Sequence, residues 1–83
     1  PTDEPSSAYI SAPMVGIFHI AEGLTSLGAT VKAGQVVGAI ESMKLMNDVV
    51  SQYDGVVAEV LVEDGAPVEY GQNLFRIELR SSG

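Results

Sequence analysis

The sequence contains no cysteine, a single histidine and only two lysines. Without cysteine the chain can form neither a disulfide framework nor a thiolate metal site or nucleophile. A zinc site lacks the nitrogen or sulfur ligands that it needs, and a Ser-His-Asp triad would depend entirely on His19. Strand alternation places His19 with Ile17 on one face of an apolar segment, which predicts a plain surface or edge position. We therefore expect no catalytic residue and no metal site.

Basic residues and long apolar runs are also scarce. Four basic residues stand against 11 acidic ones, for a formal net charge of −7, which argues against nucleic acid or an anionic membrane surface as a partner. No segment approaches the roughly 18 apolar residues of a membrane span, and none has the pattern of a secretory signal. With 83 residues, 46% of them hydrophobic, the chain can build one modest core but has little material for a deep cleft. A self-contained enzyme is therefore disfavoured.

The composition divides the chain into a short linker and one domain. Residues 1–8 combine two prolines with small polar and acidic residues and have no apolar period, which predicts the end of a flexible linker. Residues 9–80 are predicted to form the folded domain, and residues 81–83 a tail or vector-derived addition. The start at Pro1 indicates a piece of a longer polypeptide.

The predicted domain consists of short apolar runs rich in β-branched residues, separated by glycines. No window of a dozen residues has a convincing 3.6-residue period, and residues 21–27 are expected to form at most a helical turn or a loop. This pattern is typical of an all-β fold. The predicted strands are residues 9–11, 16–20, 35–42, 45–51, 56–62 and 73–79.

An internal repeat gives the fold its expected symmetry. Residues 28–35, Gly-Ala-Thr-Val-Lys-Ala-Gly-Gln, match residues 65–72, Gly-Ala-Pro-Val-Glu-Tyr-Gly-Gln, at an offset of 37 residues, and the match continues from Ile40-Glu41 to Ile77-Glu78. Each copy is too short to bury its own apolar face. Two copies should therefore pack about an approximate two-fold axis as a small sandwich or flattened β-barrel.

The repeat also singles out one lysine. Lys44 lies at the junction of the two copies, and the same offset maps it to Ser81, where the folded chain ends. A two-fold axis then puts Lys44 at the pole opposite both chain exits, whereas Lys32 lies in a repeated turn segment. Large apolar side chains flank Lys44, at a tip where Asn, Asp or Gly is usual. From these residues alone, a recognition surface and a hairpin tip with a snorkelling lysine are equally good interpretations.

The segment around Lys44 resembles a known attachment motif. Residues 41–47, Glu-Ser-Met-Lys-Leu-Met-Asn, are similar to the Glu-Ala-Met-Lys-Met motif of biotin carboxyl carrier domains, and their specific form is similar to the carriers of acetyl-CoA carboxylase. Residues 11–16, Ser-Ala-Pro-Met-Val-Gly, resemble the family's opening Ala-Pro-Met-x-Gly strand, and residues 54–55 and 63–68 resemble the segment after the motif. The resemblance implies a barrelled sandwich of two four-stranded sheets, with the modified lysine in a β-turn.

The resemblance also implies a function. Lys44 would carry covalent biotin, Met43 and Leu45 would present it to the ligase and frame the arm, and Glu41 would help ligase recognition. The implied partners are a biotin protein ligase, a biotin carboxylase and a carboxyltransferase. The domain itself would be a non-catalytic carrier that shuttles carboxylate, in acetyl-CoA carboxylase and fatty acid synthesis, in the cytoplasm or, in a plant, in the plastid stroma. The alternatives are a lipoyl carrier domain and an unmodified lipoyl-like adaptor.

The sequence departs from the family pattern at three places. Ser42 replaces the usual alanine and Leu45 the commoner methionine, and both changes are small. The span from Gly16 to Gly34 is two residues longer than the span from Gly55 to Gly71, because of the loop at residues 21–27. Some family members have a longer, proline-rich "thumb" at this place. Whether the shorter loop of this chain touches biotin is left open by the sequence.

Overall fold

A computed structural model describes residues 7–24 and 27–79 of the chain. Regular structure within these residues consists of eight β-strands, with no helix, so the predicted all-β class is confirmed. The strands are β1 (Ser7–Ser11), β2 (Gly16–Ile20), β3 (Thr30–Val31), β4 (Val36–Ser42), β5 (Leu45–Val50), β6 (Gly55–Val60), β7 (Ala66–Val68) and β8 (Asn73–Leu79).

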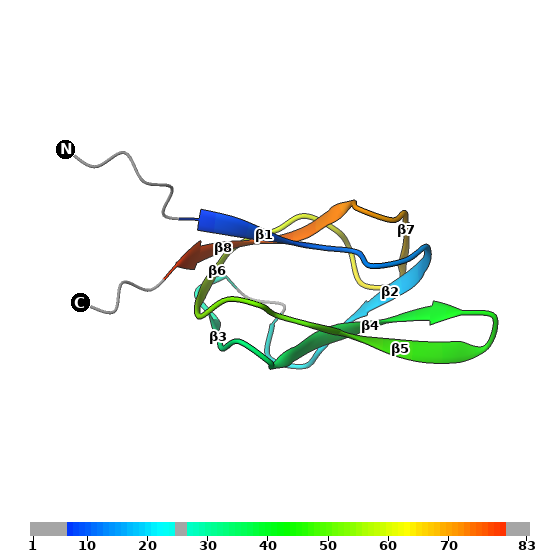
Figure 1. Cartoon of the computed structure of the whole chain (residues 1–83). Helices are drawn as coiled ribbons and strands as arrows, with labels where there is room; N and C mark the ends of the chain where they lie inside the picture. The colour runs from blue at the N-terminus through cyan, green and yellow to red at the C-terminus, as the bar shows by residue number, and fades with distance from the viewer. Residues whose placement is uncertain (1–6, 25–26, 80–83) are drawn as a thin grey trace.

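The strands form two four-stranded antiparallel sheets (Figure 1). One sheet has the order β1-β8-β6-β3 and the other β5-β4-β2-β7. No strand is shared between them, so the fold is a flattened sandwich rather than a closed barrel. This agrees with the barrelled sandwich that the resemblance implied.

The predicted two-fold repeat is present in this topology. The two sheets have equivalent strand orders: β1 corresponds to β5, β8 to β4, β6 to β2 and β3 to β7. Equivalent turns share their hydrogen bonds: Gln35 Oε1 accepts from the Lys32 backbone N–H at 2.9 Å, and Gln72 Oε1 accepts from the Glu69 N–H at 3.0 Å. The same offset of 37 residues relates the two donors and the two acceptors. The repeat seen in the sequence is therefore also present in the structure.

The core lies between the sheets and is filled by inward-facing apolar residues. Phe18 of β2 and Phe75 of β8 meet edge to face at its centre, with ring centroids 5.9 Å apart and planes at 73°. Such an arrangement is favoured by the ring quadrupoles. The other buried apolar residues are Ile10, Ala12, Leu24, Val31, Val37, Ile40, Val49, Val57, Val68, Leu74 and Ile77.

Two equivalent glycines permit close strand contacts. A Cβ on Gly16 would lie 2.5 Å from the Glu41 carbonyl oxygen, and one on Gly55 would lie 2.2 Å from the Glu78 carbonyl oxygen. Any side chain at either position would displace backbone. Gly16 therefore allows β2 to start directly beside the end of β4, close to the segment that contains Lys44.

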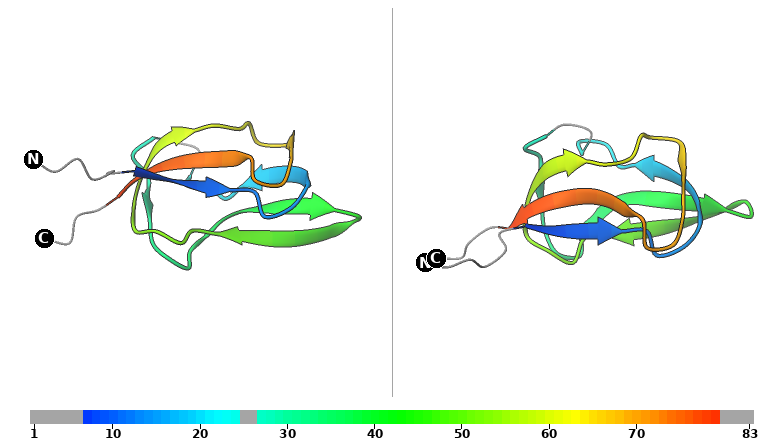
Figure 2. Two further views of the ribbon diagram at one scale, coloured as in Figure 1. Left: turned by 45° about the horizontal axis from the view of Figure 1, so that its top comes forward. Right: turned by 90° about the horizontal axis from the view of Figure 1, so that it is seen from above.

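The turn between β4 and β5 lies at one pole of the sandwich. β1 begins and β8 ends at the opposite pole, as all three views show (Figures 1 and 2). The register agrees, because Ser7 pairs with Glu78. For the described residues, the predicted position of Lys44 far from the chain exits is thus confirmed.

Several boundaries differ from the sequence-based expectation. β1 begins at Ser7, so Ser7 and Ala8, which were assigned to the linker, are strand residues; their pairing with Glu78 and Ile77 holds them in the sheet. The short strands β3 and β7 were not predicted as separate runs. Residues 1–6, 25–26 and 80–83, which include most of the predicted linker and the tail, lie outside the described part. Within that part no helix is long and apolar enough to cross a membrane.

Candidate functional site

The predicted site residues lie together in the β4–β5 hairpin. Ser42 pairs with Leu45 and Glu41 with Met46, which leaves Met43 and Lys44 as the two residues of the turn. A two-residue loop is the shortest usual hairpin connection, and it holds Lys44 in a fixed relation to both strands. The expected β-turn around this lysine is therefore present.

The backbone of this turn is unusual for its residue types. Met43 has φ 52° and Lys44 has φ 70°, and these are the two non-glycine residues with positive φ among those described. A turn with positive φ at both central residues matches the twist of the flanking strands, but it strongly favours Asn-Gly. A non-glycine residue in such a conformation costs about 1 to 3 kcal/mol. Met43 and Lys44 at the tip of the hairpin are therefore strained.

Apolar side chains that are close to the lysine in sequence are exposed, as is the lysine itself. The exposed fractions are 91% for Met43, 67% for Leu45 and 56% for Met46, and Lys44 is also exposed. Neither of the two ion pairs found among residues 7–24 and 27–79 involves Lys44. The primary amine is therefore accessible for acylation, and a partner protein can contact the exposed apolar side chains close to it in the chain.

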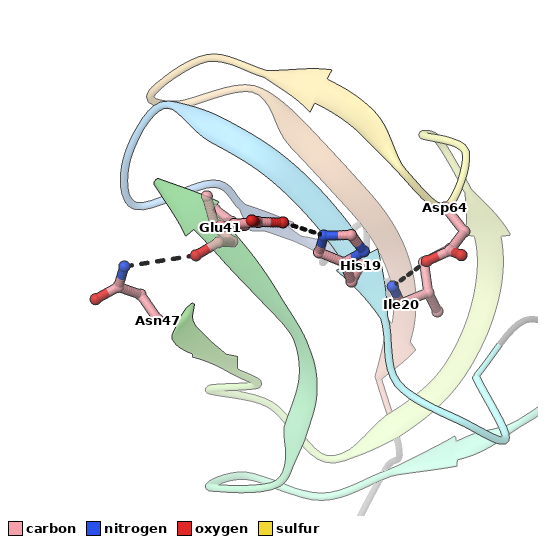
Figure 3. Close-up of polar contacts among 6 residues, drawn as sticks. His19, Ile20, Glu41, Asn47 and Asp64 are labelled. Atoms are coloured by element: carbon pink, nitrogen blue, oxygen red, sulfur yellow. Dashed lines mark hydrogen bonds and ion pairs between the residues drawn. The ribbon is translucent and has the colours of Figure 1, made fainter. Parts of the chain in front are cut away.

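A polar contact lies next to the turn, on the outer face of the β5-β4-β2-β7 sheet (Figure 3). Glu41, three residues before Lys44, has its Oε1 atom 3.2 Å from Nε2 of His19 on β2. On the other side of β4, the Asn47 side chain donates to the Ile40 carbonyl oxygen at 3.4 Å. The first contact ties the motif segment to β2, and the second joins the β5 end of the segment to β4 within the hairpin.

The contact of His19 with Glu41 was not predicted from the sequence. The sequence context of His19 predicted a plain surface position on the same face as Ile17, and both residues do face outward. The neighbouring strand supplies the missing information: Ile17 pairs with Glu41 and His19 with Ala39, which puts His19 diagonally across from Glu41. Pairing the predicted strands 16–20 and 35–42 in this register would have revealed the contact.

We also searched the described residues for a metal site and for a ligand-binding cleft. No group of three or more His, Asp or Glu side chains there is placed to hold a metal ion. A cleft of about 400 Å³ lies between β1 and β5 and is lined by residues such as Tyr9, Asp48 and Tyr53, but not by any residue of the turn. The hairpin tip combines an accessible amine with exposed apolar side chains.

Comparison with known proteins identifies the family of this chain. A family model described as "biotin-requiring enzyme" matches residues 8–77, which is most of the chain. The chain belongs to this family. The match includes the whole β4–β5 hairpin and the glycine that allows β2 to approach it.

Relatives in the biotin-requiring family carry consistent names. The chain is 42% identical over 76 residues to the biotin carboxyl carrier protein of acetyl-CoA carboxylase from Nostoc sp., covering 86% of this chain and 42% of the relative. It is 40% identical over 73 residues to the protein of the same name from Pseudomonas aeruginosa, covering 82% of this chain and 47% of the relative. The chain thus spans less than half the length of these relatives.

The fold is shared with a much larger solved structure. A single-chain, multi-domain long-chain acyl-CoA carboxylase contains a region that superimposes with a TM-score of 0.77 at 22% identity. The match covers 98% of this chain and 8% of that protein. This domain therefore has the same architecture as a small part of a multi-domain carboxylase.

Proposed function

We propose that the chain is a carrier domain that holds biotin on Lys44 through an amide to Nζ and performs no catalysis itself. The observation that carries this proposal is the placement of Lys44: an exposed amine at the tip of a strained two-residue turn, at the pole opposite the start of β1 and the end of β8. The family description supports biotin as the attached group. The names of the relatives support a carrier of acetyl-CoA carboxylase.

The residues at the tip fit an amide-linked group of this kind. Acylation removes the positive charge of Lys44, and the long, neutral arm that results extends away from the sandwich. Amide formation expels the leaving group of the activated biotin carboxyl and releases a proton from Nζ. Lys44 needs no neighbouring base in this chain, because the separate ligase that activates the carboxyl group also provides the acceptor for that proton. Met43 and Leu45 provide apolar contacts for the ligase and for the base of the arm, and Glu41 provides a charged recognition point.

Biotin, once attached, supplies a ureido nitrogen that can accept and give up a carboxyl group. The role of the protein is to bring this group to separate active sites, in a biotin carboxylase and in a carboxyltransferase. A tether keeps the group at a high effective concentration near both sites without binding it tightly at either. The partners are these two enzymes and a biotin protein ligase, and the setting is acetyl-CoA carboxylation for fatty acid synthesis, in the cytoplasm or in the plastid stroma of a plant.

Labelling with streptavidin tests the attachment. The chain is co-expressed with a biotin protein ligase and probed as the original sequence, as Lys44→Arg and as Lys32→Arg. Lys32 is the matched control, because it is the other lysine of the chain and is also exposed. We expect a signal from the original and from Lys32→Arg, and none from Lys44→Arg. An unlabelled original, or a labelled Lys44→Arg variant, contradicts the proposal.

A further inference from the structure

We propose that His19 is a positioning residue for biotin ligation, which holds the Glu41 carboxylate in the orientation that biotin protein ligase recognises. This inference rests on the proposed function, because it assigns a role in loading Lys44. It adds a residue outside the attachment motif to the surface that the ligase reads. That surface comprises the hairpin tip and the adjoining outer face of β4 and β2.

The geometry places the two side chains in contact across neighbouring strands. His19 on β2 and Glu41 on β4 both face outward, and Nε2 of the imidazole is 3.2 Å from Oε1 of the carboxylate (Figure 3). The contact engages one carboxylate oxygen and leaves Oε2 for a donor on the ligase. The side chains are 38% and 48% exposed, so a partner protein can reach the carboxylate while the imidazole still restricts it.

The internal repeat indicates that the fold does not need this contact. The equivalent of Glu41 is Glu78, and the register of β6 against β8 makes Glu59 the equivalent of His19, because Glu59 pairs with Arg76 as His19 pairs with Ala39. Glu59 accepts a hydrogen bond from Nε of Arg76 at 3.1 Å and, as a carboxylate, has no donor for Glu78. β4 and β8 nevertheless have the same pattern of buried and exposed residues. The contact is therefore specific to the sheet that carries Lys44.

Energetics also favour a role in recognition over one in stability. Exposed pairs of this type contribute little to folding, because water solvates both partners and screens their interaction. Restricting a flexible carboxylate before binding reduces the entropy that is lost when a partner engages it. The benefit should appear in the affinity of the ligase for the carrier, and not in the chemical step at Lys44.

Ligation kinetics on the full chain test the inference. The rate of biotin transfer by biotin protein ligase is measured against carrier concentration for His19→Ala, His19→Gln, Glu41→Ala and the double variant His19→Ala with Glu41→Ala. The matched control is Arg76→Ala, which breaks the other ion pair of the described residues, Arg76 to Glu59 at 3.1 Å, on the opposite sheet. Thermal unfolding of each variant checks that the fold is retained.

We expect His19→Ala to raise KM about three- to tenfold with kcat nearly unchanged, because one side chain is no longer preorganised. His19→Gln, which can still donate a hydrogen bond to Glu41, should restore most of the affinity. His19→Ala should add nothing in the Glu41→Ala background, and Arg76→Ala should behave as the original. A ligated original with an unchanged KM in His19→Ala overturns this inference alone, as does an equal effect of His19→Ala with and without Glu41. An original chain that is not ligated overturns the proposed function and this inference together.

Discussion

Met43 and Lys44 adopt consecutive left-handed backbone conformations, with φ of 52° and 70°, between two strands that are paired up to Ser42 and Leu45. Asn-Gly is the usual sequence for such a turn, since neither residue is strained there. The strain is confined to the two positions at the centre of the attachment motif. Met43 and Lys44 therefore lower the stability of the domain relative to Asn-Gly, which indicates that these side chains are kept at the tip for function.

Replacing the turn by Met43→Asn with Lys44→Gly should stabilise the domain. We expect the free energy of unfolding to rise by about 2 kcal/mol, because both residues then suit their backbone conformations. Urea denaturation measures the change. Lys44→Arg is the control that keeps the strain, and its stability should equal that of the original. A double variant no more stable than Lys44→Arg would show that the turn is not strained.

Substitution of alanine at Gly16 or Gly55 should strongly destabilise the sandwich. Each new Cβ would lie within 2.5 Å of a carbonyl oxygen on the neighbouring strand, so backbone has to move, at a cost of about 3 kcal/mol. Gly34→Ala is the control: it has φ 88° but no atom within 4 Å of an added Cβ, and should cost about 1 kcal/mol. Equal stabilities for the three variants would contradict these contacts.

Loss of the side chain at Gln35 or Gln72 should have equal effects. Each side chain accepts a hydrogen bond from a backbone N–H in an equivalent turn, so each alanine variant should lose about 1 kcal/mol of unfolding free energy. The turns are in separate parts of the molecule, and the double variant should show the sum. Chemical denaturation gives all three values, and a large inequality between the single variants would count against the two-fold relationship.

Much of the fold followed from the sequence because the repeat carries long-range information. The match of residues 28–35 to residues 65–72 fixed the symmetry, and with it the pole at which Lys44 lies. The strands β3 and β7 did not stand out, since two or three residues are too few to show alternation, and β7 contains Pro67. The structure explains this proline, because β7 is an edge strand and an edge position tolerates the missing N–H.

The site was predicted in part for a similar reason. Glu41, Met43, Lys44 and Leu45 lie within five consecutive residues, so the motif contains them all without any knowledge of strand pairing. His19 joins them only through the register of β2 against β4, which a single-strand pattern does not contain. The start of β1 at Ser7 was missed because small polar residues show no apolar period, and pairing with β8 determines it.

Attachment of biotin to Lys44 is tested by peptide-resolved mass spectrometry of the chain after co-expression with a biotin protein ligase. We expect a mass increase of one biotinyl group, located on the peptide that contains Lys44, and an unmodified Lys32. A lipoyl group on Lys44, a biotinyl group on Lys32, or an unmodified chain would contradict this expectation.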